Sequence, residues 1–138
     1  MAIRIQPLLI SDAKDLEGAF SAMVKERADA LAVQPLPITN IGQGRRIAEL
    51  AVKNRLRTVS DSKEFLEAGG LLSYGSDRLA LWAGAATFVD RILKGARPAD
   101  LPVEQPTKFE LIINLKTAKQ LRLAIPPRVL ARADKVIR

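Results

Sequence analysis

The sequence predicts an α/β fold, a three-layer sandwich built on a mostly parallel sheet. Strand and helix signals alternate along the chain, as they do in repeated strand–helix–strand units. Apolar residues make up 48% of the 138 residues and charged residues 27%, which is enough for one soluble domain with a real core. Because aromatics are only 4%, we expect a core of Leu, Ile, Val and Ala.

The N-terminal part of the chain predicts strand, helix and strand in that order. Apolar residues alternate over 3–10, which is typical of a strand. Ser11 or Asp12 can cap the helix that follows, and its apolar stripe runs to about Arg27. Residues 29–35 then predict a short, buried strand.

Two more helices and a brief strand are expected in the middle of the chain. Thr39 or Asn40 can cap a second helix that buries one apolar face. Residues 57–59 predict the third strand. Asp61, with Glu64 three residues later, resembles a capping box that opens a short helix ended by two glycines.

A long helix and a proline-rich connector come next. Residues 71–74 predict the fourth strand, and Asp77 can cap a helix of about 17 residues that Gly95 stops. Since this helix is apolar on two sides, we expect a sheet to cover one side and another element to cover the second. Residues 96–108 form the connector, because their prolines do not suit a helix interior.

The last third of the chain returns to the sheet. Alternating apolar residues over 109–115 predict a fifth strand. Asn114 can cap a short helix through Leu121, and Pro126 and Pro127 precede a final helical turn.

Two absences lower the expectation of catalysis. The chain has no Cys, which excludes disulfides, thiolate nucleophiles and Cys-based metal sites. It has no His, which removes the commonest metal ligand and the commonest general base near neutral pH. We therefore expect a non-enzyme without a metal or other cofactor. The pattern Ser-x-x-Lys of some acyl-transfer enzymes occurs at 11–14 and 60–63, but its companion Lys-Thr-Gly motif does not follow.

The net charge is +7 and the pI about 10.1, which would suit nucleic acid or an anionic membrane. The cations are scattered and are not interleaved with base-stacking aromatics, so we expect a solvated basic surface and no nucleic-acid partner. No run approaches the roughly 20 apolar residues of a membrane span. The N-terminus does not resemble a secretory signal, so we expect a cytoplasmic protein as encoded, or a periplasmic one if the chain is a fragment of an exported parent.

Five stretches of the chain, taken in order, resemble one protein family. They are residues 67–70, 73–75, 92–95, 98–108 and 113–119. The order resembles the C-terminal part of the solute-binding proteins of ABC importers, in the subfamily that includes tryptophan binders, and the similarity extends over residues 15–138. It implies a single truncated domain over residues 1–138, equivalent to one periplasmic-binding-protein-like (type I) lobe of a protein that holds its ligand between two lobes.

The resemblance also implies where a ligand would bind. Open parallel sheets bind ligands beyond the carboxyl ends of their strands, and three loops, 35–40, 60–62 and 74–77, lie there. The candidate ligand-binding residues carried by these loops are Thr39, Asn40, Ser60, Asp61, Tyr74 and Asp77. Three of them, Asn40, Asp61 and Asp77, are equally suited to capping helices, and Tyr74 to ending a strand with a hydrated hydroxyl. Relatives often carry aromatics in the first loop and near the third strand; this chain does not, so we expect no aromatic platform for a substrate ring.

The expected function is that of a solute-binding lobe of an ABC importer. It would bind a small organic solute such as an amino acid, and a homodimer, with exchange of the segment from Leu79 onward, would complete the site. An ABC permease would be a partner only if the chain is part of a longer protein. The alternative is a cytoplasmic interaction or regulatory module, or a decayed fragment with no ligand.

Overall fold

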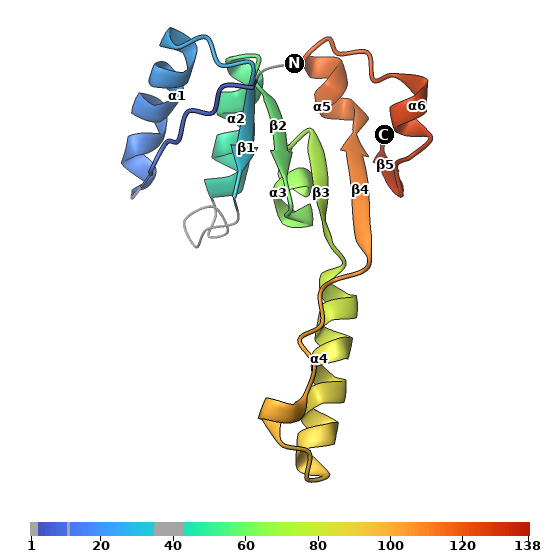
Figure 1. Cartoon of the computed structure of the whole chain (residues 1–138). Helices are drawn as coiled ribbons and strands as arrows, with labels where there is room; N and C mark the ends of the chain where they lie inside the picture. The colour runs from blue at the N-terminus through green and yellow to red at the C-terminus, as the bar shows by residue number, and fades with distance from the viewer. Residues whose placement is uncertain (1–2, 11, 35–42) are drawn as a thin grey trace.

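The sheet has five strands in the order of the chain, β1-β2-β3-β4-β5 (Figure 1). The computed structural model describes residues 3–10, 12–34 and 43–138. Strands β3 and β4 pair antiparallel and the other three pairings are parallel, so the predicted α/β fold with a mostly parallel sheet is confirmed. The strands are β1 (Ala30–Val33), β2 (Arg57–Ser60), β3 (Leu72–Ser76), β4 (Phe109–Asn114) and β5 (Lys135–Ile137).

The helices alternate with these strands, and polar side chains cap several of them. Ser62, Asp77 and Asn114 each accept hydrogen bonds from the first backbone amides of the helix that follows. The helical elements are η1 (Ala13–Asp15), α1 (Leu16–Lys25), α2 (Gly44–Lys53), α3 (Lys63–Glu67), α4 (Arg78–Leu93), η3 (Pro98–Asp100), α5 (Leu115–Gln120) and α6 (Pro127–Leu130).

The core lies where α1, α2 and α3 pack on β1 and β2. Aliphatic side chains dominate it, as the composition predicted, with two phenylalanines added. Its members are Leu16, Phe20, Met23, Val33, Ile47, Ala48, Ala51, Leu56 and Phe65. A second buried group comes from β4, where Ile112 and Ile113 are both inaccessible to solvent or nearly so.

Three sequence predictions about the secondary structure were wrong. Residues 3–10 form no strand, because the chain there pairs with no other strand; Leu8 and Ile10 pack against the core, whereas Ile3 and Ile5 are exposed. Asp61 does not cap α3, because Ser62 Oγ accepts the amide of Phe65 at 3.1 Å. Strand β5 was not predicted, since three residues are too few to show a period. The caps proposed at Thr39 and Asn40 lie outside the described residues, as does Ser11.

Helix α4 departs furthest from expectation. It points away from the sheet, and the returning connector runs back beside it (Figure 1). None of its residues is buried, and Leu79, Trp82 and Leu93 keep 80%, 69% and 81% of their surface exposed. The prediction that a sheet covers this helix was wrong for the described chain. With 16 residues it extends about 24 Å, longer than any strand of the sheet, the longest of which has six residues. We call residues 77–108 the arm.

None of the helices in the described ranges is both long enough and apolar enough to pass through a membrane.

Candidate functional site

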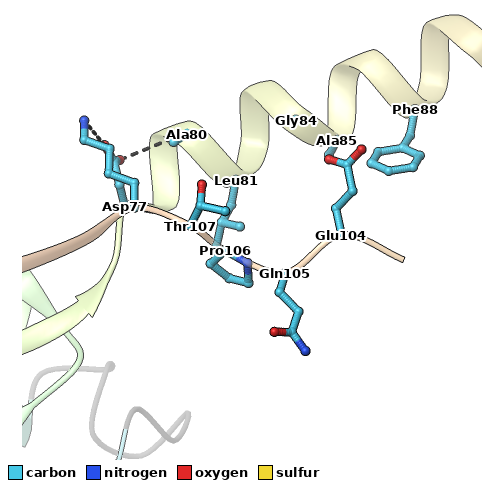
Figure 2. A pocket seen from close by; sticks show the side chains of 11 residues that line it. Asp77, Ala80, Leu81, Gly84, Ala85, Phe88, Glu104, Gln105, Pro106 and Thr107 are labelled. Carbon is cyan, nitrogen blue, oxygen red and sulfur yellow. Dashed lines mark hydrogen bonds and ion pairs between the residues drawn. The ribbon is translucent and has the colours of Figure 1, made fainter. Parts of the chain in front are cut away.

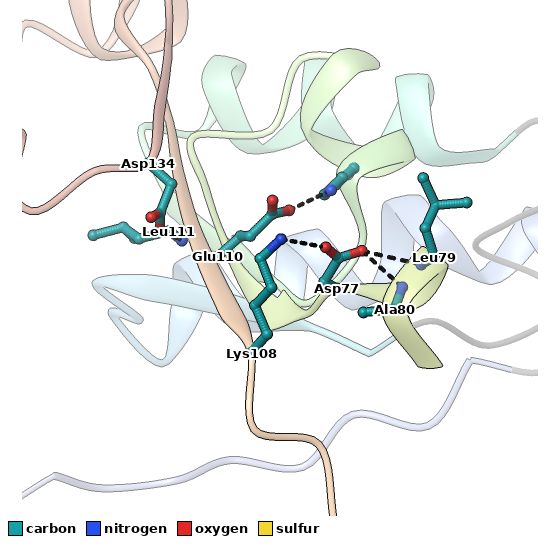
Figure 3. A network of polar contacts seen from close by, with 8 residues as sticks. Asp77, Leu79, Ala80, Lys108, Glu110, Leu111 and Asp134 are labelled. Carbon is teal, nitrogen blue, oxygen red and sulfur yellow. Dashed lines mark hydrogen bonds and ion pairs between the residues drawn. The ribbon is translucent and has the colours of Figure 1, made fainter. Parts of the chain in front are cut away.

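The arm joins the sheet through two neighbouring backbone positions, Asp77 and Lys108. The Asp77 amide donates to the Lys108 carbonyl at 3.0 Å. The side chains pair as well, with Lys108 Nζ 2.9 Å from Asp77 Oδ2 (Figure 3). The other carboxylate oxygen of Asp77, Oδ1, accepts the amides of Leu79 and Ala80 at the start of α4. One carboxylate therefore caps the helix and binds both ends of the arm together.

The electrostatics at this base follow from those contacts. The hydrogen bond from Lys108, followed by the one from the Ala80 amide, lowers the pKa of Asp77 below its ordinary value. The same ion pair raises the pKa of Lys108. Beside it Lys63 pairs with Glu110 of β4, which raises the pKa of Lys63. Both Asp77 oxygens are thus already occupied, and the capping role that the sequence left open for Asp77 is confirmed.

Strand β2 ends at Ser60, and Asp61 follows it in the loop that leads to α3. Ser60 is buried, and its Oγ accepts the amide of Ser62 at 3.2 Å. Asp61 is exposed. A Cβ added at Gly75 would lie only 2.6 Å from the Asp61 carbonyl oxygen, so this glycine allows the β2–α3 loop to lie directly against β3. The backbones of Asp61 and Gly75 therefore touch at the carboxyl edge of the two strands.

An exposed aromatic pair lies beside that edge. The rings of Tyr74 and Phe109 stack with centroids 5.7 Å apart and an interplanar angle of 21°. Both stay largely open to solvent, Tyr74 at 58% and Phe109 at 47% exposure. We call this pair the aromatic platform. The sequence led us to expect none, because it lacks the aromatics that relatives carry in the first loop and near the third strand. These two residues are distant in the chain, and the antiparallel register of β3 and β4 brings them together.

The predicted site residues do not converge on one pocket. Ser60 lies opposite Ser73 in the β2–β3 register, and successive residues of a strand point to opposite faces. The side chains of Ser60 and Tyr74 therefore project on opposite sides of the sheet, and the exposed Asp61 lies at the edge between them. Thr39 and Asn40 lie outside the described residues. Phe109, which sequence reasoning did not select, is the nearest aromatic partner; its place at the start of an alternating strand was the only signal for it.

A groove of about 310 Å³ runs along the arm rather than along the loops. Small residues of α4, Ala80, Gly84 and Ala85, form one wall, and Pro106 and Thr107 of the connector form the other (Figure 2). Phe88 and Glu104 lie towards its far end. Of the predicted site residues that the structure describes, Asp77 alone lines it.

The side chains of the described residues form no recognisable metal-binding site. Within residues 3–10, 12–34 and 43–138, no group of three or more carboxylates is close enough to hold one. The chain has no His or Cys to add.

Comparison with known proteins defines the class. The model of the family described as "ABC transporter substrate binding protein" matches residues 1–137, and the chain belongs to that family. No curated protein matches it. The fold is that of a periplasmic-binding-protein-like lobe, and the resemblance of the sequence to tryptophan-binder relatives is confirmed.

Solved structures agree with this placement. A conserved domain protein from Vibrio cholerae is 26% identical with a TM-score of 0.78, and the match covers 89% of this chain and 41% of that one. An ABC domain from Streptococcus pneumoniae, in complex with L-Trp, is 26% identical with a TM-score of 0.80, covering 93% and 43%. The substrate-binding protein CD0873 from Clostridium difficile, in a ligand-free, open structure, shares the fold at 20% identity and a TM-score of 0.69, covering 93% and 42%. The chain thus spans about two fifths of the length of these proteins.

Proposed function

We propose that the chain is a solute-binding lobe that takes an amino acid, foremost one with an apolar or aromatic side chain, at the carboxyl edge of β2 and β3. The observation that carries the proposal is the aromatic platform of Tyr74 and Phe109, exposed next to the loop of Asp61. The platform would hold the ligand's side chain by stacking, and the exposed Asp61 carboxylate would attract its ammonium group.

Two further observations support this proposal. The family is one of substrate-binding proteins. The Streptococcus pneumoniae neighbour, into which 93% of this chain aligns, holds L-Trp. Among the residues that the sequence selected, we keep Asp61 and Tyr74 for the site, with Thr39 and Asn40 as further candidates from the first loop. Ser60 is assigned to holding the loop, because it is buried, accepts the Ser62 amide and lies on the opposite face of the sheet from Tyr74. Asp77 is assigned to positioning the arm.

We propose further that a second copy of the chain covers the arm. Leu79, Trp82, Val89 and Leu93 expose large apolar surfaces on α4, and groups of such residues on a protein surface mark contact sites. Exchange of the arm, from Leu79 onward, between two copies would bury these side chains and enclose a ligand that one lobe alone leaves half in water. An ABC permease enters as a partner only for a longer parent protein.

Thermal unfolding in the presence of single amino acids tests the ligand. A solute at 100 times its dissociation constant stabilises the fold by about 2.7 kcal/mol, so L-Trp, L-Phe and L-Leu should each raise the melting temperature, and L-Glu should not. Phe109→Ala and Asp61→Asn should each abolish the rise. Val103→Ala, which trims an exposed apolar residue of the connector, is the matched control and should keep it. No shift with any amino acid would contradict the proposal.

Light scattering after size exclusion tests the covered arm. The wild type should elute as a dimer at about 10 μM, and replacement of Leu79 and Trp82 by Ser should give monomers. Leu9→Ser, which removes an equally exposed leucine outside the arm, should leave the dimer intact. A monomeric wild type would contradict the proposed dimer, but it would leave the proposal that the chain binds an amino acid unaffected.

The exposed apolar side of α4 also favours a second function, that of an interaction module without a ligand. That function requires a stable complex with a different protein and no response to amino acids. It is excluded if the dimer and a thermal shift are both observed.

A further inference from the structure

The positive charge of the chain is concentrated at one end of the sequence. Residues 115–138 hold seven of the 22 Lys and Arg but only one of the 15 Asp and Glu, a net +6 of the total +7. Residues 1–114 are therefore close to neutral, with 15 cations against 14 anions. The cations of this segment are Lys116, Lys119, Arg122, Arg128, Arg132, Lys135 and Arg138. We call residues 115–138 the basic end.

The fold keeps these charges together and open to solvent. Helices α5 and α6 and the edge strand β5 lie next to each other at one end of the sheet (Figure 1). All seven cations are exposed. In the part of the chain that the structure describes, none of them forms an ion pair. The single acid, Asp134, accepts the Leu111 amide at 2.8 Å, which ties its oxygen to the start of the β4–β5 pairing.

The surface of the basic end suits a diffuse anionic partner. The large apolar residues that the described chain exposes all lie at or before Phe109, so the basic end lacks the apolar anchors of a protein interface. It contains no Phe, Trp or Tyr on which a nucleic-acid base could stack. Its helices, of six and four residues, are too short to lie in a DNA groove as a recognition helix.

A second copy of the chain does not offer the complementary charge. The positive and negative charges of residues 1–114 nearly cancel. Many of the acidic side chains there already form ion pairs, as Glu17 does with Arg46 and Asp90 with Lys94. An extended negative surface must therefore come from elsewhere. Cations spread over three short elements, without apolar anchors, fit the smooth negative surface of a bilayer.

We propose that the basic end binds the surface of an anionic lipid bilayer by long-range attraction, without insertion. A chain bound to the bilayer through its basic end keeps the candidate ligand site free. Strand β4 runs antiparallel to β3, so α5 begins at the edge of the sheet opposite the carboxyl ends of β2 and β3, where Asp61 lies. The proposal does not depend on the ligand or the dimer described above.

Vesicle sedimentation tests it with the full chain. Vesicles containing about 30% phosphatidylglycerol in phosphatidylcholine should sediment the protein, and pure phosphatidylcholine vesicles should not. Binding should fall at least tenfold between about 0.1 M and 0.5 M salt, because the Debye length shrinks. The variant with Lys116, Lys119, Arg128 and Arg132 all replaced by Gln should bind at least tenfold more weakly.

A matched variant controls for net charge alone. Replacement of Lys25, Lys53, Arg45 and Arg91 by Gln also removes two lysines and two arginines, but from outside the basic end. All four are exposed, and none forms an ion pair within the described part of the chain. It should keep most of the binding. Equal loss in both variants, equal binding to neutral and anionic vesicles, or tighter binding to a short RNA than to the vesicles would each overturn the proposal.

Lysine acetylation of the wild type gives a test that needs no variant to fold. With anionic vesicles present, Lys116, Lys119 and Lys135 should be protected relative to the free protein, while Lys25 and Lys53 should react as before. Protection confined to lysines outside the basic end would contradict the assignment.

Discussion

The carboxylate of Asp77 accepts from the Lys108 ammonium at 2.9 Å, and the Asp77 amide donates to the Lys108 carbonyl at 3.0 Å. These contacts join residues 31 positions apart, at the two points where the chain enters and leaves the arm. The side chain of Asp77 is only 12% exposed, whereas that of Lys108 is mostly in solvent. The two ends of the arm are therefore held together, at the point where they meet the sheet, by one backbone bond and one shielded carboxylate.

This pair predicts how the arm responds to pH. The pKa of Asp77 is lowered in the folded state, so its stabilising contribution is complete above the unfolded-state pKa and is lost as pH falls through the lower folded-state value. The pKa of Lys108 is raised, so on the alkaline side the contribution is lost as pH rises through the folded-state value.

Trp82, the single tryptophan, lies on α4 and can report arm melting by fluorescence. In the wild type the arm should melt at lower temperature as the pH is brought below about 4. Asp77→Asn keeps an oxygen to cap the helix but removes the ion pair, and its melting should vary less with acid. An unchanged acid response in this variant would show that other carboxylates control the arm. Added salt should weaken the wild-type effect, since Lys108 is exposed.

Two glycines should respond oppositely to alanine. At Gly75 a Cβ would lie 2.6 Å from the Asp61 carbonyl and 3.0 Å from its Cα, so the loop must move and the free energy of unfolding should fall by about 1–3 kcal/mol. At Gly84, inside α4, a Cβ meets nothing within 4 Å, and alanine should stabilise the helix by about 0.5–1 kcal/mol. Urea unfolding measures both. A harmless Gly75→Ala would mean that Asp61 and Gly75 do not touch.

A buried hydroxyl should matter more than an exposed one. Thr117 Oγ1 donates to the Gly69 carbonyl at 2.9 Å and ties α5 to the turn after α3. Thr117→Val keeps the shape and leaves that carbonyl without its partner, at a cost of about 1–2 kcal/mol in unfolding free energy. Thr87→Val is the matched change on exposed α4, where the hydroxyl only reaches its own helix at 3.5 Å, and it should have almost no effect. Equal effects would argue against the α5 contact.

Residues of one strand should separate stability from ligand binding. Ile113 is fully buried, and Ile113→Ala should lower the unfolding free energy by about 2–5 kcal/mol. Phe109 begins the same strand with 47% of its surface exposed, so Phe109→Ala should cost much less stability but abolish the shift by aromatic amino acids. Loss of folding in Phe109→Ala would make the platform a structural feature rather than a binding surface.

Much of the architecture could be predicted locally. The caps Asp12, Asp77 and Asn114 and the stop at Gly95 are all where the pattern placed them, because capping depends on residues within one turn of the helix end. Residues 3–10 show the limit of such patterns. Their alternation matches a strand, yet a strand also requires a pairing partner, and that depends on distant residues.

The sequence by itself determined most of the helices, strands β1 to β4, the mostly parallel sheet, the family and the absence of His and Cys chemistry. These follow from periodicity, capping and composition, which are local or summed properties of the chain. Only the tertiary structure decided that Tyr74 stacks on Phe109, that Asp77 closes the arm with Lys108, and that α4 projects without cover. Each of these depends on which strands pair and in what register, and that is set by the packing of residues far apart in the sequence.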